Sequence, residues 1–468
     1  MHYCKYNSEY IPLLRYINIL QRTGMPGPLG LPIIGHLHIL NPEAPYLSLH
    51  AWTNLYGKVF KIRFGSVPCV VISDVDVLKK VFSQEESTGR APLYLTHGIM
   101  QGNGLICSEG PTWQEQRIDQ NLGTECGVEV CQLLEKKLSA EGGIIDPAEI
   151  LGHCIGNAMN KLIFGITYKE DCKVWIWLQD LREKGIRMMG VSNVVNFLPW
   201  FRFFPYNVRN MRWIKMGQVE SHLEYERVIR EREIRLEEGE EPECITDFYL
   251  QEVQKRNKAG LNLNSFTRNQ LYHLQADMFG AGTDTTVTSI LWNLLILSSE
   301  GQNDLQKRIH DELDNGRQDQ TQVSLLRAAT LEVSRLRPVT PLGVPHGALA
   351  SLQVGDWRVN KGTMLLPNHW SINRDPSVWK NPEKFDETRF LDPTVAFKIF
   401  PFQTGKRRCI GADPARDIIE GVLSHILKVY HVELEPDVDP WHDPRHGFTL
   451  EPQKFRVKFT KRVTTVKN

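Results

Sequence analysis

The sequence has no pair of cysteines in a C-x-x-C arrangement, although nine cysteines are spread over its 468 residues. This absence argues against a zinc or iron–sulfur site, whose ligands usually come in such closely spaced pairs. The odd number and irregular spacing of the cysteines also disfavour a secreted disulfide framework. No N-x-S/T glycosylation sequon occurs either. Together these absences indicate reduced thiols on the cytosolic side of the cell.

The sequence also lacks a run of about 20 apolar residues, the length needed to cross a bilayer. The apolar stretch nearest the N-terminus, residues 11–20, is interrupted by Arg15. It fits a helix lying on a membrane surface or an ordinary short helix equally well. We therefore describe residues 1–23 as an N-terminal segment whose membrane anchor is absent or truncated.

Neither sign of charge is in excess, because 55 lysines and arginines balance 55 aspartates and glutamates. This balance gives no support for nucleic acid as a partner. No G-x-G-x-x-G motif is present, so the chain shows no sign of a nucleotide-binding or flavin domain of its own. Apolar residues make up 41% of the chain, enough to build a large core.

Patterns along the chain predict a mainly helical protein with small β-sheets, an α+β fold. Residues 24–37, rich in proline and glycine, predict an irregular hinge before one large domain at 38–468. Alternation over 58–74 predicts a β-hairpin, and Asp74 is placed to cap the helix that follows it. Helical periodicity dominates 110–335, where the charged run 231–241 predicts a solvated helix face and loop. Strand patterns return at 355–366 and 454–462.

Cys409 stands behind three consecutive cations and between two glycines, in the stretch "PFQTGKRRCIGADPAR". Cations beside a thiol favour its thiolate form. The apolar spacing after Cys409 predicts a helix, whose N-terminus also favours an anion. The residues alone leave three roles open for this thiolate: a nucleophile, a redox thiol or a metal ligand.

Three further patterns combine polar side chains with helical spacing. The helix predicted at 269–299 holds "AGTDTT", in which small residues and Asp284 interrupt an apolar run. This fits either a helix–helix crossing or a helix passing over a flat ligand, with Asp284 and Thr285 delivering protons. Glu332 and Arg335 are three residues apart on one helix face. Trp113 and Arg117 are four apart and present two hydrogen-bond donors, or form a surface cation–π pair.

The stretch "FQTGKRRCIG" matches the F-x-x-G-x-R-x-C-x-G signature without a gap, and the chain thereby resembles the cytochrome P-450 haem-thiolate monooxygenases. "AGTDTT", "EVSR", "WQEQR" and "PGPLGLPIIGH" resemble other motifs of this family, in the same order and at similar distances, over about residues 24–460. The resemblance implies the P-450 fold, with haem b held between the helix at 269–299 and the cysteine loop.

The resemblance assigns a role to each candidate residue. Cys409 is implied to be the axial thiolate ligand of the haem iron, and Asp284 with Thr285 to deliver the protons that oxygen activation needs. Glu332 and Arg335 are implied to pair with Arg389 as structural supports of the cysteine loop. The residues implied to bind the haem propionates are Arg90, Trp113, Arg117, His346 and Arg407.

The chain departs from the family pattern in several places. The family's F-x-P-E-R-F is "FDETRF" here, and Pro414 replaces an aliphatic residue after the cysteine loop. Proline is tolerated there because that position lies in the first turn of a helix. The segments after Arg117 and at 314–330 are shorter than the family pattern.

The resemblance implies a monooxygenase that inserts one oxygen atom of O₂ into a lipophilic substrate. Electrons come from a separate NADPH-dependent flavoprotein reductase, which Lys398, Lys406 and Arg408 could contact. Two alternatives are a haem-thiolate isomerase or dehydratase and a haem-binding protein inactivated by its shortened segments. The Asp284–Thr285 pair argues against the isomerase. The implied location is the cytosolic face of the endoplasmic reticulum membrane.

The expected substrate is steroid-like. Residues 88–110 and 337–347 resemble microsomal drug- and steroid-hydroxylating members, and more narrowly the arthropod ecdysteroid 25-hydroxylases of steroid hormone biosynthesis. A broad-specificity xenobiotic monooxygenase is the alternative. Polar groups that could orient a substrate are offered by Thr96, His97, Asn103 and Thr340.

Overall fold

A β-hairpin followed by a capped helix opens the folded part of the chain. The computed structural model describes residues 24–116, 136, 143–188, 193–316 and 323–462. Strands β1 (Val59–Phe64) and β2 (Val67–Ile72) pair antiparallel, as the alternation predicted. The Asp74 carboxylate accepts from the first backbone N–H groups of α3 (Val75–Phe82), which confirms the predicted cap.

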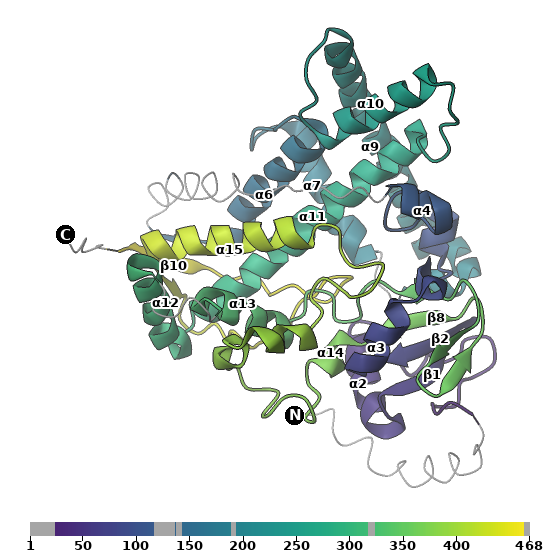
Figure 1. Ribbon diagram of the computed structural model, residues 1–468. Coiled ribbons are helices and arrows are strands. Elements are labelled where there is room, and N and C mark those ends of the chain that lie inside the picture. The colour runs from purple at the N-terminus through teal and green to yellow at the C-terminus, as the bar shows by residue number, and fades with distance from the viewer. Residues whose placement is uncertain (1–23, 117–135, 137–142, 189–192, 317–322, 463–468) are drawn as a thin grey trace.

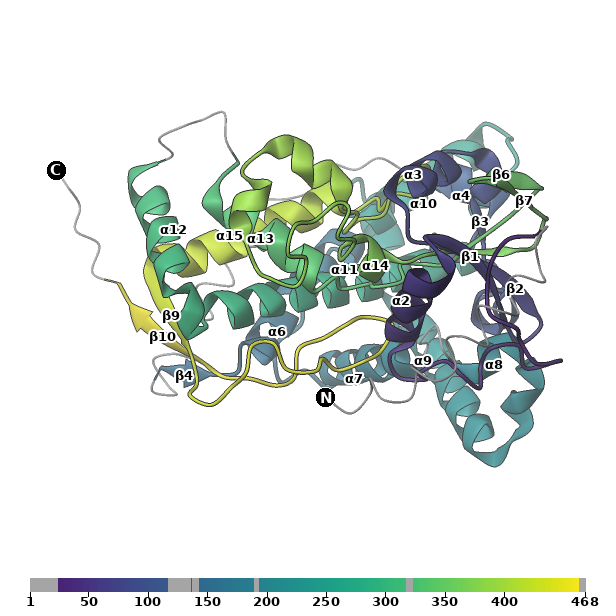
Figure 2. The same cartoon turned by 90° about the horizontal axis from the view of Figure 1, so that it is seen from below.

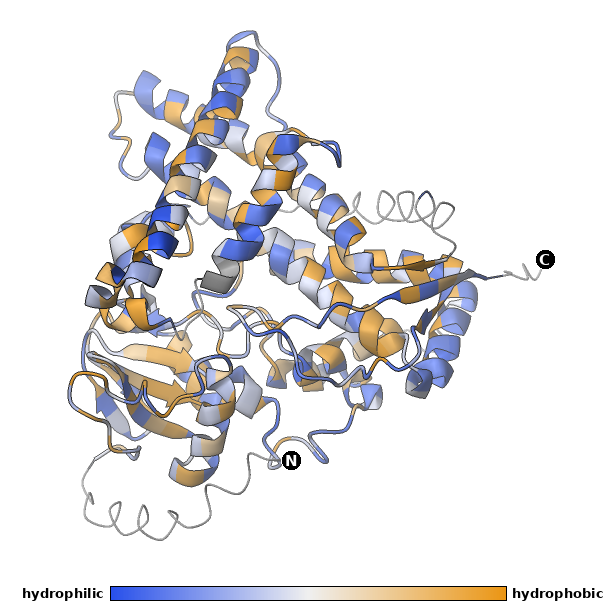
Figure 3. Cartoon of the chain, turned by 180° about the vertical axis from the view of Figure 1, so that it is seen from behind, coloured by the Kyte–Doolittle hydropathy of each residue, from blue (hydrophilic) through white to orange (hydrophobic). Residues whose placement is uncertain are grey.

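The hairpin is one edge of a five-stranded sheet with the order β1-β2-β8-β5-β3. Strand β8 (Met364–Pro367) runs parallel to β2, although almost three hundred residues separate Ile72 from its partner Pro367. Strand β5 (His346–Gly347) then pairs antiparallel with β3 (Gly89–Arg90). Figure 3 shows apolar residues concentrated in these strands. The sheet thereby brings together segments from the two ends of the chain.

Helices form the rest of the domain and surround the long helix α11, which crosses its middle (Figures 1 and 2). Short 3₁₀ or π turns link several of them: η1 (Glu85–Ser87), η2 (Tyr94–Ile99), η3 (Pro199–Phe203), η4 (Glu300–Gln302), η5 (Glu387–Phe390) and η6 (Pro393–Lys398). The helices after α3 are α4 (Gly110–Gln116), α6 (Pro147–Phe164), α7 (Lys173–Met188), α8 (Val194–Phe197), α9 (Pro205–Glu237), α10 (Ile245–Lys258), α11 (Arg268–Leu297), α12 (Asn303–Asn315), α13 (Leu325–Leu336), α14 (His369–Ile372) and α15 (Ala412–Val429). Helix α2 (Pro45–Tyr56) precedes the hairpin.

The C-terminal half of α11 is the centre of the largest core cluster. It packs with α6, α13 and α15 and with strands β9 (Tyr430–Leu434) and β10 (Val457–Lys461). The indole N–H of Trp292, fully buried on α11, donates to the Leu450 carbonyl at 2.7 Å. Strands β10, β9 and β4 (Ile144–Ile145) form a three-stranded sheet, and β6 (Leu352–Val354) pairs with β7 (Trp357–Val359). The predicted fold class, mainly helical with small sheets, is confirmed.

The two glycines in the middle of α11 face different surroundings. A Cβ at Gly282 would collide with the Met159 side chain of α6, so this glycine lets two helices cross closely. A Cβ at Gly280 would meet no atom within 4 Å, and the neighbouring Ala281 is exposed. The helix contact is therefore present at Gly282, and the passage of the other face over a flat ligand stays a prediction.

A buried ion pair on α13 ties together the segment that leads to the cysteine loop. Arg335 and Glu332 have fully buried side chains and form two hydrogen bonds of 2.7 Å. The guanidinium also donates to the carbonyls of Asn373 and Pro382. The Glu332 carboxylate also accepts a hydrogen bond of 3.3 Å from the Nε of Arg389 in η5, as the family resemblance implied.

The charged run at 231–241 is only partly solvated, which corrects the sequence prediction. Arg232 of α9 is buried and pairs with the fully buried Asp247 of α10. The run faces a second helix at this point, and a sequence pattern on one helix does not show which of its charges meets a partner.

The described N-terminal region, residues 24–37, is irregular, as its prolines and glycines predicted. It is bound to the edge of the sheet, where the backbone N–H of Lys61 in β1 donates to the Pro26 carbonyl at 2.8 Å. Residues 1–23, named above as the N-terminal segment, lie outside the described residues. Within the described ranges, the structure contains no helix with the length and apolar character required to span a bilayer.

Breaking the α13 ion pair should prevent the protein from folding and binding haem. Substitution Glu332→Ala leaves the Arg335 charge buried without its carboxylate, which is expected to destabilise the fold by about 3–5 kcal/mol. Thermal unfolding and the haem content of the purified protein measure the effect. Asp180→Ala, which breaks an exposed pair with Lys184, is the matched control and should cost about 0.5 kcal/mol or less. A stable, haem-loaded Glu332→Ala protein would contradict a structural role.

Candidate functional site

The loop that carries Cys409 runs from the end of η6 to the start of α15. Its backbone is held by the Cys409 N–H, which donates to the Phe402 carbonyl at 2.9 Å. Gly405 adopts φ of 75°, and a Cβ there would collide with the Phe82 carbonyl of α3. Only glycine permits this close approach. The loop thus lies against α3 and leaves the Cys409 thiol exposed, whereas Cys69, Cys107, Cys154 and Cys244 are buried.

Cys409 also stands just before the N-terminus of α15, as predicted. The helix begins at Ala412, so its first N–H groups and the positive end of its dipole lie close to the thiol. Two of the three preceding cations reach acidic partners: Lys406 contacts Glu85, and Arg408 lies 3.6 Å from Asp413. This environment suits an anionic sulfur ligand.

Arg407, the middle cation, points into the protein. Its guanidinium donates to the carbonyls of Thr88 at 2.8 Å, Leu105 at 3.2 Å and Ser108. The same group lies 4.4 Å from the centre of the Trp113 ring of α4. The structure therefore brings two of the expected propionate-binding residues, Arg407 and Trp113, into contact.

Arg90 and His346 are direct partners in the β3–β5 ladder. The Arg90 Nε donates to the Ile106 carbonyl at 2.6 Å, and burial lowers the pKa of this arginine to about 10. His346 is stacked on Phe82 with its Nδ1 2.8 Å from the Ser87 carbonyl. Burial, and then the charge of Arg90, hold the His346 pKa well below its usual value.

These residues fit the haem that the family signature implies. His346 Nε2 is buried without a hydrogen-bond partner among the described residues. It belongs to a cluster with Arg90, Arg407 and Trp113, all built around the segment 87–109. A carboxylate next to His346 would stabilise its protonated form and receive a charge-assisted hydrogen bond. Arg117, the fifth expected ligand, lies outside the described residues.

Asp284 and Thr285 occupy the middle of α11 but face different directions. The Thr285 hydroxyl donates to the Ala281 carbonyl at 2.7 Å and is exposed. Asp284 is buried, 3.0 Å from Arg182 of α7, and accepts a hydrogen bond from Thr449 at 3.0 Å. Burial raises the Asp284 pKa to about 6, and Arg182 opposes this increase. A carboxyl with this pKa can gain and lose a proton near neutral pH.

Sequence reasoning missed the residues that hold these groups in place. Arg182 and Thr449 lie more than a hundred residues from Asp284, and no local pattern connects them. Asp277 and Gln270 of α11 bind the segment 104–106, and neither was singled out. For Asp277 a signal existed, because a carboxylate in an apolar helix is as unusual there as Asp284.

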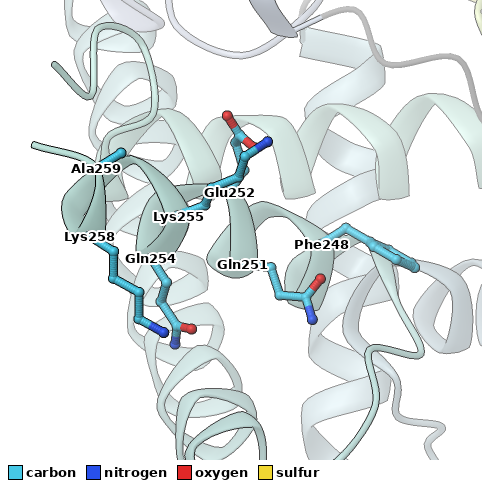
Figure 4. Close-up of a pocket in the computed structure, with 7 residues that line it drawn as sticks. All are labelled: Phe248, Gln251, Glu252, Gln254, Lys255, Lys258 and Ala259. Carbon is cyan, nitrogen blue, oxygen red and sulfur yellow. The ribbon is translucent and has the colours of Figure 1, made fainter. Parts of the chain in front are cut away.

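A shallow depression on α10 lies apart from this cluster. Its lining comes from one helix and its C-terminal end (Figure 4): Phe248, Gln251, Glu252, Gln254, Lys255, Lys258 and Ala259. None of the expected site residues lines it. The chemistry of the depression therefore does not bear on the haem-thiolate site.

Comparison with known proteins agrees with the site geometry. The family model of cytochrome P450 matches residues 25–459. Cytochrome P450 306a1 of Drosophila melanogaster is 34% identical, with 96% of this chain and 90% of that protein covered. Human cytochrome P450 1B1 is 27% identical (96% and 89% covered), and human cytochrome P450 2U1 is 26% identical (93% and 89% covered).

The chain belongs to the cytochrome P450 family. It is a monooxygenase, an oxidoreductase that uses O₂, and its cofactor is haem, iron protoporphyrin IX, bound through a cysteine thiolate. The alignment with the Drosophila protein extends over 528 positions, more than the 468 residues of this chain. That relative therefore has internal residues for which this chain has no counterpart.

Replacing the proposed sulfur ligand should remove the spectral signature of thiolate ligation. The reduced carbon monoxide complex of the wild-type protein is expected to show a red-shifted Soret band, and Cys409→Ala should lose it. Cys172→Ala, at a half-buried cysteine, is the control and should retain the band. A Cys409→Ala protein with an unchanged band would exclude Cys409 as the ligand.

Proposed function

We propose that this monooxygenase hydroxylates a steroid-like substrate, with electrons supplied by an NADPH-dependent flavoprotein reductase. The substrate is a ketosteroid precursor of moulting hormone, and the reaction is hydroxylation of its side chain. The location of residues 88–110 carries the proposal. This is the segment whose sequence resembles the arthropod ecdysteroid hydroxylases, and it supplies Arg90 and contacts α11 and Arg407.

The composition of the segments around the site also supports a lipophilic substrate. Residues 94–107 and 338–345 contain no Asp, Glu, Lys or Arg. A rigid polycycle buried against such segments gains about 25 cal/mol per Å² of apolar surface. The 34% identical relative is an insect protein, whereas the human relatives are 26–27% identical. This difference is in line with the arthropod resemblance of residues 88–110.

The polar groups expected to orient the substrate are not equally accessible. Thr96 is buried, and its hydroxyl lies 2.9 Å from the Ala91 carbonyl and 2.8 Å from His97 Nδ1. The Asn103 amide donates to the Met100 carbonyl. Because these groups stabilise the turn at 91–103, they shape the site rather than recognise the steroid. Thr340 is half-buried, and its hydroxyl has no hydrogen-bond partner among the described residues, so it could bind a substrate ketone or hydroxyl.

Haem supplies the oxygen chemistry of the proposed reaction, because an axial thiolate favours O–O cleavage. The chain's own contribution is to keep the thiolate ionised, hold the propionates and provide protons. Thr285 places its hydroxyl on the accessible face of α11, next to exposed Ala281. Asp284, whose pKa is raised to about 6, is the second group on this helix that can exchange a proton near neutral pH.

Removing the Thr285 hydroxyl should divert electrons from product to hydrogen peroxide. Thr285→Ala is expected to keep haem and substrate binding, since among the described residues its hydroxyl bonds only the Ala281 carbonyl of its own helix. The loss of an ordered proton donor should lower the ratio of product formed to NADPH consumed by about tenfold or more. Thr286→Ala, at a buried neighbour, is the control. Equal coupling in both variants would remove Thr285 from the mechanism.

The surface beside the cysteine loop suits an acidic redox partner. Lys398, Lys406 and Arg408 are exposed there, together with Phe397, which is 71% exposed. Lys406 and Arg408 also contact Glu85 and Asp413, so their field is weaker than their number suggests. The face therefore contributes to the rate of encounter and its salt dependence more than to affinity.

Exposed aromatic residues support attachment to the cytosolic face of the endoplasmic reticulum membrane. Phe203 at the end of η3 and Tyr206 in the first turn of α9 are 69% and 77% exposed. Leu31 and Ile33 are exposed near the same edge. Gly35 forms a β-bridge with Phe64, and the ring of Phe197 in α8 stacks on the Phe64 ring. Aromatic and aliphatic side chains of this kind insert into the headgroup boundary of a bilayer.

The proposed function is tested by reconstitution with the reductase and phospholipid vesicles. The ketosteroid should displace the water on ferric haem at micromolar concentration and yield a side-chain alcohol, identified by mass spectrometry. Cys409→Ala controls for reductase-derived products, and sedimentation with the vesicles reports membrane attachment. Ready turnover of unrelated drug-like compounds without any steroid response would instead establish a broad xenobiotic monooxygenase.

A further inference from the structure

Asp277, one turn before Ala281 on α11, binds the backbone of Leu105 and Ile106. One of its carboxylate oxygens accepts from the N–H groups of Leu105 and Ile106, both at 2.7 Å. The approach is so close that a Cβ at Gly104, where φ is 78°, would collide with that carboxylate. Asp277 is buried, and desolvation raises its pKa to about 7 against the effect of these two hydrogen bonds and of Arg90.

The carbonyl groups of the same two residues are bound by arginines. The Leu105 carbonyl accepts from Arg407 at 3.2 Å, and the Ile106 carbonyl accepts from Arg90 at 2.6 Å. The two residues thus stand between a carboxylate on their N–H groups and two guanidinium groups on their carbonyls. The N–H of Ile106 and the carbonyl of Leu105 belong to one peptide group, so Asp277 and Arg407 form a continuous chain in which polarisation strengthens each hydrogen bond. Arg90 is linked to Asp277 through the position of the Ile106 backbone.

We propose that Asp277 is a positioning residue that sets the orientation of Arg90 and Arg407 toward the haem propionates. It acts through the peptide groups of Leu105 and Ile106 and touches neither the haem nor the substrate. The inference rests on the assignment of Arg90 and Arg407 as propionate ligands, made above. If this is so, a residue of α11 that binds backbone N–H groups controls how fast haem dissociates.

Gln270, two turns earlier on α11, provides a matched comparison. Its side chain exchanges two hydrogen bonds of 2.9 Å with Gly104, so it anchors the same segment. The Gly104 carbonyl accepts from Gln270 itself, whereas those of Leu105 and Ile106 accept from the arginines. Loss of Gln270 should loosen the segment without disturbing the arginines directly.

The test compares haem transfer from ferric holoenzyme to excess apomyoglobin and the propionate bands of the resonance Raman spectrum. Asp277→Asn should speed haem loss by about tenfold or more, the usual effect of removing an outer-shell partner of a cofactor site. It should also shift the propionate bands. Gln270→Ala should leave these bands in place and change the rate by less than about threefold. Equal effects of the two variants would show that Asp277 is merely structural and would overturn the proposal.

Two further measurements separate the possible failures. In a double-mutant cycle of Asp277→Asn with Arg90→Gln, the haem-loss rates should be non-additive, and additivity would contradict the proposed coupling. If Arg90→Gln and Arg407→Gln both leave haem loss unchanged, the propionate assignment itself is wrong. Should Asp277→Asn not fold, Asp277→Glu is measured instead. It keeps the charge but displaces the peptide groups, so unshifted propionate bands in that variant would overturn the proposal.

Discussion

The buried contact between Arg335 and Glu332 fixes the part of the chain on which the haem-thiolate site is built. One guanidinium binds its own helix through Glu332 and the following segment through the carbonyls of Asn373 and Pro382. Glu332 in turn accepts the Asp386 N–H and Arg389. Two fully buried charges are tolerated because every strong partner they need is present. The chain from 373 to 389 therefore enters the cysteine loop from a fixed position.

Arginine on backbone carbonyls is a recurring device of this fold. Arg90 and Arg407 also donate to carbonyls, but Arg335 has a carboxylate partner as well, in Glu332. Carbonyls satisfy the geometry of a guanidinium without cancelling its charge, so a buried group of this kind favours an anion nearby. At the haem site the expected anions are the propionates. His346 stacks on Phe82, and its Nε2 has no hydrogen-bond partner among the described residues. Burial lowers its pKa, and a nearby anion would favour its protonated form.

Much of the fold could be predicted from local patterns. Alternation through Phe60, Ile62 and Phe64 and the capping position of Asp74 depend on neighbouring residues, and the structure confirms both. The position of Cys409 just before a helix was likewise predictable, since its loop and helix are contiguous. The partners of the buried charges could not be predicted in this way. Arg232 was expected in solvent and meets Asp247 on the next helix, and Asp284 meets Arg182 and Thr449. Such pairs are decided by tertiary packing, which no single stretch of sequence encodes.

The parallel pairing of β2 with β8 has a consequence for the order of folding. Ile72 is synthesised long before its partner Pro367, and Arg90 long before His346. The sheet cannot close until most of the chain has left the ribosome, and contacts of such high sequence separation form slowly. The cysteine ligand emerges later still. Haem capture is therefore a late event, and until then the hairpin β1–β2 exposes an unpaired apolar edge of the kind that chaperones protect.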